Sequence, residues 1–407
     1  MTSGMILCLL MAAQTSPSSM PADSWMAVPN SAMRSVAPTN GQFPGTWGVS
    51  GPGMVIAAWG GGAFDAKRGR LVLWGGGHAD YYGNELYAFD VATLKWLRLT
   101  DPFVNPVMDQ EVNGDGTPNS RHTYGGLAYI AHADRFFGQA GSLAGIGFAT
   151  CNRTWTFDFD AKKWTDRAPA TTSGGGFGVN CSYDPATKKV WWCSSGLWSY
   201  DYDANAWTKH NADEYYYHSS AMDTKRGQMV IVGNGLVCSY DLKNANYTRQ
   251  VWTTTGGDAL ISKGNIGLDY DPTIDRIVGW AGGSPYLLDP ATKTWTAGSA
   301  VGASPPGQNG IYGRWRYVPS ANAFVVVTGF DENVYFYKAS AGVGTPAPAP
   351  TPSPAPAPSA PVPAPNSSGG SSDGGSDGRC GCGSTAAGAG PESLLLAALS
   401  LLAVSRR

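Results

Sequence analysis

One stretch of the chain decides its fold: residues 86–96, LYAFDVATLKW, in which Asp90 ends an alternating run and Trp96 follows six positions later. The same step from Asp to Trp recurs after glycine-rich apolar stretches, with five extra residues in one copy. The copies are Asp90 to Trp96, Asp158 to Trp164, Asp201 to Trp207, Asp241 to Trp252 and Asp289 to Trp295. A motif that recurs in register indicates one supersecondary unit for each copy.

Each unit is predicted to be a four-stranded antiparallel sheet. In the first copy, residues 54–64 are expected to form a strand, the apolar run 71–74 a second, and the alternating residues 84–90 a third, before Trp96 opens the fourth. Later tryptophans follow one another at intervals of 43, 45 and 43 residues, which is typical of β-propeller blades. Six such units can be counted.

The two ends of this region predict how the ring closes. The sixth unit contains residues 334–337 but no tryptophan-led strand after them, whereas a strand near Trp25 belongs to no unit. Adding that strand to the last blade would close the ring and protect the exposed sheet edges. We therefore predict an all-β, six-bladed β-propeller over residues 24–338, followed by a disordered tail rich in Pro, Ala, Ser and Gly.

The repeat pattern also resembles a known family. A glycine doublet, an aromatic residue before Asp, a spacer and Trp are the pattern of kelch repeats, so residues 24–338 resemble kelch-type and galactose-oxidase-like β-propellers. The resemblance implies a fold and says little about chemistry. Galactose oxidase binds copper with two Tyr and two His, and Tyr217-His218 resembles its Tyr-His pair. That enzyme has a seventh blade and a further β domain, so a copper-radical oxidase is the least favoured function, and no metal or cofactor is predicted.

The segments outside the propeller predict export. Residues 1–16 contain an apolar run that resembles a signal peptide, and residues 341–378 form a Pro/Ala and then Gly/Ser linker. Residues 379–407 contain Cys380 and Cys382, a short apolar segment and a basic end. This order resembles the myxobacterial C-terminal sorting tail (MYXO-CTERM), which implies processing at the cysteines and anchoring at the outer cell surface. A tail with a chance apolar end is the alternative.

The amino-acid composition narrows the classes of molecule that the protein is expected to bind. The chain of 407 residues has a net charge of −2, with only 14% charged residues and no basic stripe interleaved with aromatics. Nucleic acid is therefore not expected as a partner, and membrane contact is expected only through the tail. A monomer is expected, which binds an extracellular glycan or a surface protein.

Four cysteines lie within the propeller region, an even number that suggests disulfides in an exported protein. They are Cys151, Cys181, Cys193 and Cys238. Four cysteines allow three pairings, and the sequence does not choose among them. Cys181 and Cys193 flank a predicted hairpin and can face each other across it.

Candidate site residues are expected to gather where the loops of one propeller face meet. His78 follows a glycine-rich turn, and His122 and His218 stand at the start of predicted inner strands. The full candidate set is His78, Asp80, Tyr81, Arg121, His122, Tyr217 and His218, together with Arg314 and Trp315. Two long excursions from the repeat, residues 97–120 and 142–150, are expected to shape the rim of this face.

Three functions fit this set. Tyr and Trp can stack on sugar rings while Arg and Asp bond hydroxyls, which favours ligand binding at the mouth of the central channel. A polysaccharide lyase or hydrolase is the alternative, in which a histidine acts as general base and an arginine neutralises a uronic acid. The same side chains can instead tie blades together through loop carbonyls. A pure scaffold is expected if side chains plug the channel mouth.

Overall fold

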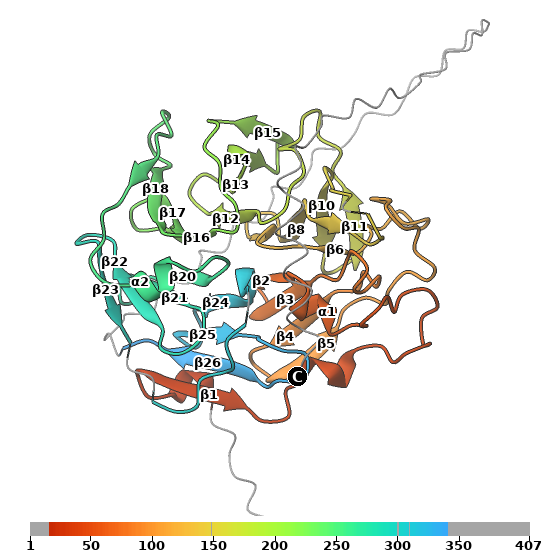
Figure 1. Cartoon of the computed structure of the whole chain (residues 1–407), viewed down its shortest axis with the longest axis horizontal. Helices are drawn as coiled ribbons and strands as arrows, with labels where there is room; N and C mark the ends of the chain where they lie inside the picture. The colour runs from red at the N-terminus through yellow and green to blue at the C-terminus, as the bar shows by residue number, and fades with distance from the viewer. Residues whose placement is uncertain (1–15, 148, 299–300, 309, 341–407) are drawn as a thin grey trace, which may run out of the picture. The chain divides into compact units, whose positions relative to one another are not determined.

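The computed structural model describes residues 16–147, 149–298, 301–308 and 310–340, and everything below concerns these residues. Six four-stranded antiparallel sheets surround one axis, so the predicted all-β, six-bladed propeller is confirmed (Figure 1). The signal peptide, the linker and the sorting tail predicted from the sequence lie outside the described residues, apart from Ser16. No described helix is long and apolar enough to cross a membrane.

Each blade runs from an inner to an outer strand. Blade 1 is β2 (Gly61–Asp65), β3 (Arg70–Trp74), β4 (Tyr87–Asp90) and β5 (Lys95–Arg98), and blade 2 is β7 (Leu127–Ile130), β8 (Arg135–Gln139), β10 (Thr154–Asp158) and β11 (Lys163–Asp166). Blade 3 is β12 (Asn180–Asp184), β13 (Lys189–Ser194), β14 (Gly196–Asp201) and β15 (Ala206–Lys209). Blade 4 is β16 (Ser219–Asp223), β17 (Gln228–Gly233), β18 (Leu236–Asp241) and β19 (Gln250–Val251).

The remaining elements complete the ring. Blade 5 is β20 (Gly267–Asp271), β21 (Arg276–Trp280), β22 (Tyr286–Asp289) and β23 (Thr294–Ala297), and blade 6 is β24 (Trp315–Val318), β25 (Ala323–Val326), β26 (Val334–Lys338) and β1 (Ser24–Val28). Short elements outside the blades are the strands β6 (Arg121–His122) and β9 (Ser142–Leu143), the helices α1 (Met54–Ala57) and α2 (Asp258–Ile261), and the 3₁₀ turns η1 (Pro17–Ser19), η2 (Met33–Val36) and η3 (Tyr312–Arg314).

The N-terminal strand closes the ring as predicted. β1 pairs antiparallel with β26, with Trp25 opposite Tyr337 and Met26 opposite Phe336. The indole of Trp25 is buried, and its centroid lies 5.5 Å from that of Trp280 in the neighbouring blade. The strand therefore covers the last open edge and adds a side chain to the packing between blades 5 and 6.

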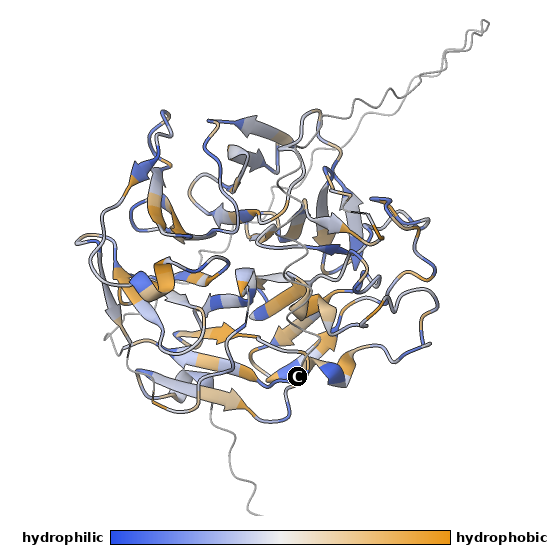
Figure 2. Cartoon of the chain, in the orientation of Figure 1, coloured by the Kyte–Doolittle hydropathy of each residue, from blue (hydrophilic) through white to orange (hydrophobic). Residues whose placement is uncertain are grey.

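The recurring Asp and Trp have separate local tasks. The carboxylate of Asp90 accepts a hydrogen bond from the backbone N–H of Thr93 at 2.9 Å, which fixes the turn between β4 and β5. Trp96 then packs 5.4 Å from Phe89 across the two strands. Apolar side chains are concentrated in the blade strands, including β3, β17 and β25 (Figure 2), so packing between sheets forms the core.

The first inner strand differs from its prediction. Residues 54–57 form the helical turn α1, and β2 begins only at Gly61. A Cβ atom at Gly61 would lie 2.0 Å from the carbonyl oxygen of Tyr124 in the next blade. The backbones therefore approach too closely for any residue but glycine, and the apolar residues before it fold back as a helix instead.

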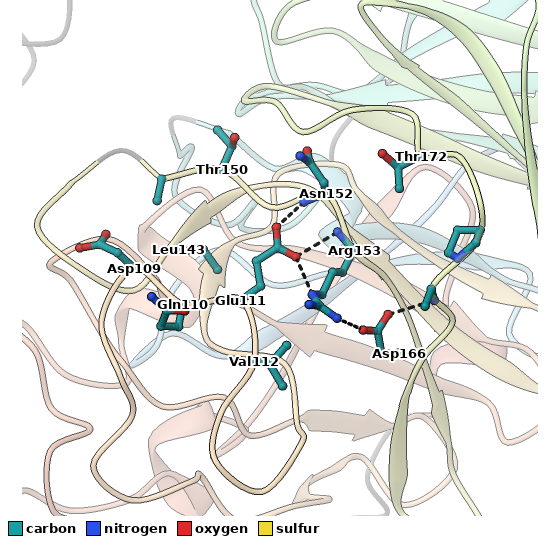
Figure 3. Close-up of a pocket in the computed structure, with 13 residues that line it drawn as sticks. Asp109, Gln110, Glu111, Val112, Leu143, Thr150, Asn152, Arg153, Asp166 and Thr172 are labelled. Atoms are coloured by element: carbon teal, nitrogen blue, oxygen red, sulfur yellow. Dashed lines mark hydrogen bonds and ion pairs between the residues drawn. The ribbon is translucent and has the colours of Figure 1, made fainter. Parts of the chain in front are cut away.

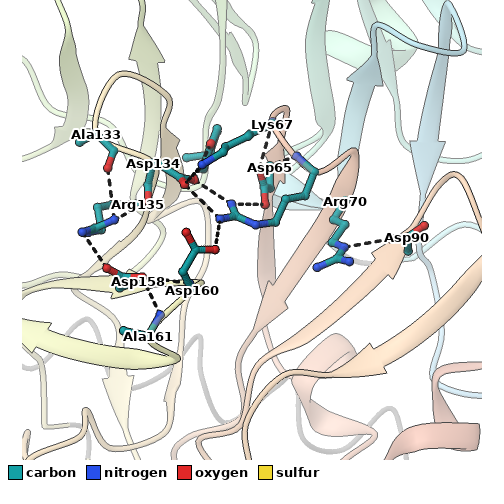
Figure 4. Close-up of polar contacts among 12 residues, drawn as sticks. Asp65, Lys67, Arg70, Asp90, Ala133, Asp134, Arg135, Asp158, Asp160 and Ala161 are labelled. Atoms are coloured by element: carbon teal, nitrogen blue, oxygen red, sulfur yellow. Dashed lines mark hydrogen bonds and ion pairs between the residues drawn. The ribbon is translucent and has the colours of Figure 1, made fainter. Parts of the chain in front are cut away.

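We call the face on which the inner strands begin the upper face, and the opposite one the lower face. On the lower face, ion pairs join neighbouring blades. Arg68 of blade 1 contacts Asp134 at 2.7 Å and Asp160 at 2.8 Å in blade 2. Figure 4 shows Asp134 and Asp160 beside Asp65 and Lys67 of blade 1. Arg226 of blade 4 contacts Asp275 of blade 5 in the same way, at 2.7 Å. The lower face is thus held by repeated structural contacts.

The predicted facing of two cysteines is wrong. Cys181 lies opposite Trp192 in the β12–β13 pair, and Cys193 lies opposite Asn180, so the two thiols project from opposite faces of the sheet. All four described cysteines are buried with free thiols, Cys151 and Cys238 included. Burial raises the pKa of each thiol well above its ordinary value, which keeps them protonated and unreactive.

Candidate functional site

A ring of unusual backbone conformations marks the upper face. One residue with positive φ lies just before each of the six inner strands, and five of these residues are not glycine. They are Trp59, Tyr124, Gly178, Tyr217, Asn265 and Tyr312, with φ between 48° and 60°. Backbone hydrogen bonds link neighbours in this ring: Tyr124 N–H donates to Trp59 O at 2.7 Å, and Asn265 N–H to Tyr217 O at 2.9 Å. Left-handed conformations cost energy for residues with a side chain, so the ring closure imposes them.

The ring places aromatic side chains on the channel axis. Tyr124, Tyr217 and Tyr312 come from alternate blades, and the centroid of Tyr124 lies 5.8 Å from each of the other two. Trp59 packs against the same cluster. We call these four residues the aromatic floor. Because Tyr124 and Tyr312 are buried while Trp59 and Tyr217 are half-buried, the axis is filled at this level and a ligand can rest only above it.

A hydrogen-bonded acid and histidine stand beside the aromatic floor. His122 Nε2 lies 2.9 Å from Asp80 Oδ2, and the two side chains are 5% and 28% exposed. The His122 ring is 5.0 Å from Trp59 and 6.0 Å from His78. Burial, with a smaller contribution from nearby His122, lowers the pKa of His78, so that ring is neutral at pH 7. The arrangement offers polar atoms next to aromatic surfaces.

Close backbone packing holds these polar residues in place. Gly77 has φ of 86°, and a Cβ atom there would lie 2.4 Å from the Cα of Arg121. The loop between β3 and β4 therefore lies directly on β6, which carries His122. The hydroxyl of Ser120 donates toward the carbonyl oxygens of Gly75 and Tyr81, at 3.1 and 3.0 Å, and fixes the same loop. Two segments distant in sequence thus bring Asp80 to His122.

The two predicted arginines are placed inside the protein. Arg121 is 0% exposed and donates to the carbonyl oxygens of Asn119 and Glu111 at 3.1 and 3.4 Å. Arg314 is 1% exposed and donates to the carbonyl oxygens of Gly60, Val327 and Gly310 at 2.9, 2.5 and 2.5 Å. Burial lowers the pKa of Arg314 to about 10. Arg314 therefore ties the last blade to the first, and neither guanidinium reaches the surface of the mouth.

Three other candidates lie away from the floor surface. Trp315 is buried in the core and donates its indole N–H to Val278 O at 3.2 Å. Tyr81 is buried, and its hydroxyl donates to Glu85 Oε1 at 2.7 Å. His218 lines a narrow space within the channel, and burial lowers its pKa. Of the nine predicted residues, the structure brings His78, Asp80, His122 and Tyr217 together at the mouth.

Sequence reasoning missed most of the aromatic floor. The candidate set drawn from the sequence contains Tyr217 but lacks Trp59, Tyr124 and Tyr312, although each of these three stands directly before a glycine that leads into an inner strand. The pair Phe177-Gly178 repeats the pattern in blade 3, with Phe177 6.3 Å from Tyr124. An aromatic residue followed by glycine, present at the start of four of the six units, is the signal that could have identified the floor.

A cavity of about 670 Å³ lies on the rim, over blade 2 (Figure 3). Its walls come from the connection before β6, from the excursion after β9 and from the segment after β11, so the predicted rim excursions do enclose space. Glu111 accepts hydrogen bonds from the backbone N–H groups of Asn152 and Arg153, at 2.6 and 3.1 Å. The Arg153 guanidinium lies between Glu111 and Asp166 and pairs with both. We call this space the rim cavity.

Comparison of the chain with protein-family models and with curated proteins returned no match. Within the part of the chain that the structure describes, no group of three or more His, Cys, Asp or Glu side chains is arranged to hold a metal ion. Function is therefore argued from the geometry of the upper face.

Proposed function

We propose that this protein is an exported, surface-anchored propeller of the kelch type that binds an extracellular glycan at the mouth of its channel. The observation that carries the proposal is the aromatic floor with the Asp80–His122 pair beside it. Aromatic faces pack against the C–H surfaces of sugar rings, and a few fixed polar groups orient the hydroxyls. A β-propeller is a scaffold for either binding or catalysis, and this surface is equipped for binding.

The accessible aromatic residues extend beyond the axis. Tyr216 is 55% exposed, and its ring lies 4.1 Å from Tyr217, so it widens the floor toward blade 4. The exposed face of this ring is available for stacking on a sugar. The export and anchoring parts of the proposal rest on the sequence of the two ends alone. A surface protein is the other partner class for the same floor.

Binding of polysaccharides to the purified chain tests this proposal. We expect Trp59→Ala and Tyr216→Ala to weaken binding of the best glycan by about tenfold or more, or ~1.4 kcal/mol, because each removes an aromatic contact surface. Tyr183→Ala is the matched control: Tyr183 is half-buried and bonds His132 on the lower face. Unchanged affinity in both floor variants, or an equal loss in the control, would reject the mouth as the glycan site.

The enzyme alternative retains one supporting observation. The Asp80–His122 pair has the geometry of a carboxylate that orients a general base. A uronate lyase also needs a cation for the substrate carboxylate, and Arg121 and Arg314 are buried on carbonyl oxygens. A two-carboxylate hydrolase cannot use Glu85, which is fully buried. New reducing or unsaturated ends that disappear in His122→Ala would establish catalysis, and their absence with retained binding supports a lectin-like function.

A further inference from the structure

The rim cavity shares a wall with the mouth. The backbone N–H of His78 donates to Leu143 O at 2.8 Å, and Gly145 N–H donates back to His78 O at 3.0 Å. Leu143 lines the rim cavity, while His78 lies beside His122 at the mouth. The rim cavity and the mouth are therefore neighbouring spaces, connected through the backbone pairing of residues 143–145 with His78.

The lining of the rim cavity is acidic. Its charged side chains are Asp109, Glu111, Arg153 and Asp166, so three negative charges face one positive charge and the formal sum is −2. Glu111 and Asp166 share Arg153, whereas Asp109 is exposed and forms no ion pair with any described residue. An additional cation is therefore favoured near Asp109, and an additional carboxylate is repelled.

The rest of the lining suits a polyhydroxylated ligand. Gln110, Thr150, Asn152 and Thr172 present amide and hydroxyl groups, which both donate and accept hydrogen bonds (Figure 3). The volume of about 670 Å³ lies within the range of small-molecule sites and exceeds the needs of bound water. Hydroxyl-binding groups together with a net negative charge are the complement of a sugar that carries an amine.

We infer that the rim cavity is a subsite for a cationic amino-sugar unit, and that the ligand is an oligosaccharide with free amines that spans the rim cavity and the mouth. This inference rests on the proposed glycan-binding function and names its substrate class. It replaces the acidic glycan considered from the sequence, because the arginines expected to neutralise a uronate are buried on carbonyl oxygens. The neighbouring negative group on the mouth side, Asp80, adds to the same preference.

Calorimetric titration of the full chain with three tetrasaccharides tests the inference: a β-1,4-glucosamine tetramer, its fully N-acetylated form, and a galacturonate tetramer. We expect the amine form to bind about tenfold more tightly than the acetylated form and the uronate to bind most weakly. Asp109→Asn should weaken the amine form by about three- to fivefold, as for a partly exposed ion pair, and leave the acetylated form unchanged. Raising the salt concentration should reduce the same preference. Asp203→Asn, which alters an exposed acid in a lower-face turn, is the matched control.

The outcomes separate the two proposals. If Trp59→Ala weakens every saccharide while Asp109→Asn changes none, the mouth is the glycan site and the rim-cavity inference is overturned. Equal or tighter binding of the galacturonate tetramer also overturns it. If no saccharide binds, both the proposed function and this inference fail.

Discussion

The carboxyl group of Glu85 is fully enclosed and accepts hydrogen bonds from the hydroxyls of Tyr81 at 2.7 Å and Tyr87 at 2.5 Å. Burial raises its pKa above the ordinary value of 4.5, and the two hydrogen bonds oppose that rise only in part. A carboxyl whose pKa is higher in the folded state binds its proton more tightly there. The protonated Glu85 carboxyl therefore contributes to the free energy of unfolding below pH 4.5, and this contribution is lost as the pH rises through the folded-state pKa.

Glu85→Gln is expected to remove this pH dependence. The amide keeps an oxygen that accepts from Tyr81 and Tyr87 and carries no charge at any pH. The variant should match the wild type near pH 4 and exceed its melting temperature at pH 7, since each unit of upward pKa shift corresponds to about 1.4 kcal/mol. Thermal unfolding at a series of pH values measures the difference. A gap that is constant with pH would contradict the assignment to Glu85 ionisation.

At the scale of elements, the sequence repeat predicted the strands but not every boundary. The apolar run at residues 71–74 lies in β3. Both faces of a blade pack against neighbouring blades, so successive side chains of this strand are all buried and all need to be apolar. Residues 54–57 were expected in a strand and are helical, because the close approach of Gly61 to the next blade delays the strand. That approach is a property of neighbouring blades, and within residues 54–64 only the three glycines at 60–62 indicate it.

The closing strand gives a prediction at this scale. Trp25→Ala should lower the free energy of unfolding by about 3–5 kcal/mol, because its indole is buried against Trp280, Trp315 and Tyr337. Denaturant unfolding measures the loss. Met26→Ala, on the same strand with a half-buried side chain, is the control and should cost clearly less. Equal losses in both variants would mean that β1 acts through its backbone pairing and adds little through the tryptophan.

At the scale of the whole ring, ion pairs between neighbouring blades stabilise the lower face. On the lower face, Arg68–Asp134 and Arg226–Asp275 join blades 1 to 2 and 4 to 5. Desolvation alone would raise the pKa of Asp134, but hydrogen bonds from Arg68, Lys67 and Tyr129 outweigh it and hold that pKa well below 3.8. The hydrogen bond from Arg226 likewise holds the pKa of Asp275 well below 3.8. A depressed carboxyl pKa contributes stability that is present above pH 3.8 and is lost as the pH falls below it.

Asp134→Asn combined with Asp275→Asn is therefore expected to destabilise the ring at pH 7 by about 1–3 kcal/mol in total, a range that is discounted because the pairs are partly exposed. The loss should shrink as the pH is lowered through 3.8, since the carboxyls of the unfolded wild-type chain then gain protons, whereas those of the folded ring, with their depressed pKa, stay ionised to lower pH. Unfolding curves at pH 7 and pH 3 measure this change. Asp203→Asn serves as control, because Asp203 is exposed and its ion pair with His132, at 3.5 Å, lies within the distance of a weak surface contact. A loss as large at pH 3 as at pH 7 would contradict the electrostatic explanation.

The amino-acid sequence by itself determined the number of blades, the Asp and Trp of each outer hairpin, and the closure at Trp25, because these depend on short, repeated patterns of burial and turn formation. Only the tertiary structure decided which side chains meet at the mouth. The guanidinium groups of Arg121 and Arg314 are hydrogen-bonded to backbone carbonyl oxygens inside the ring, while Trp59 and Tyr217 remain half-buried on the axis. The direction of a side chain near the axis is set by contacts with other blades, and those contacts exist only once the ring has closed.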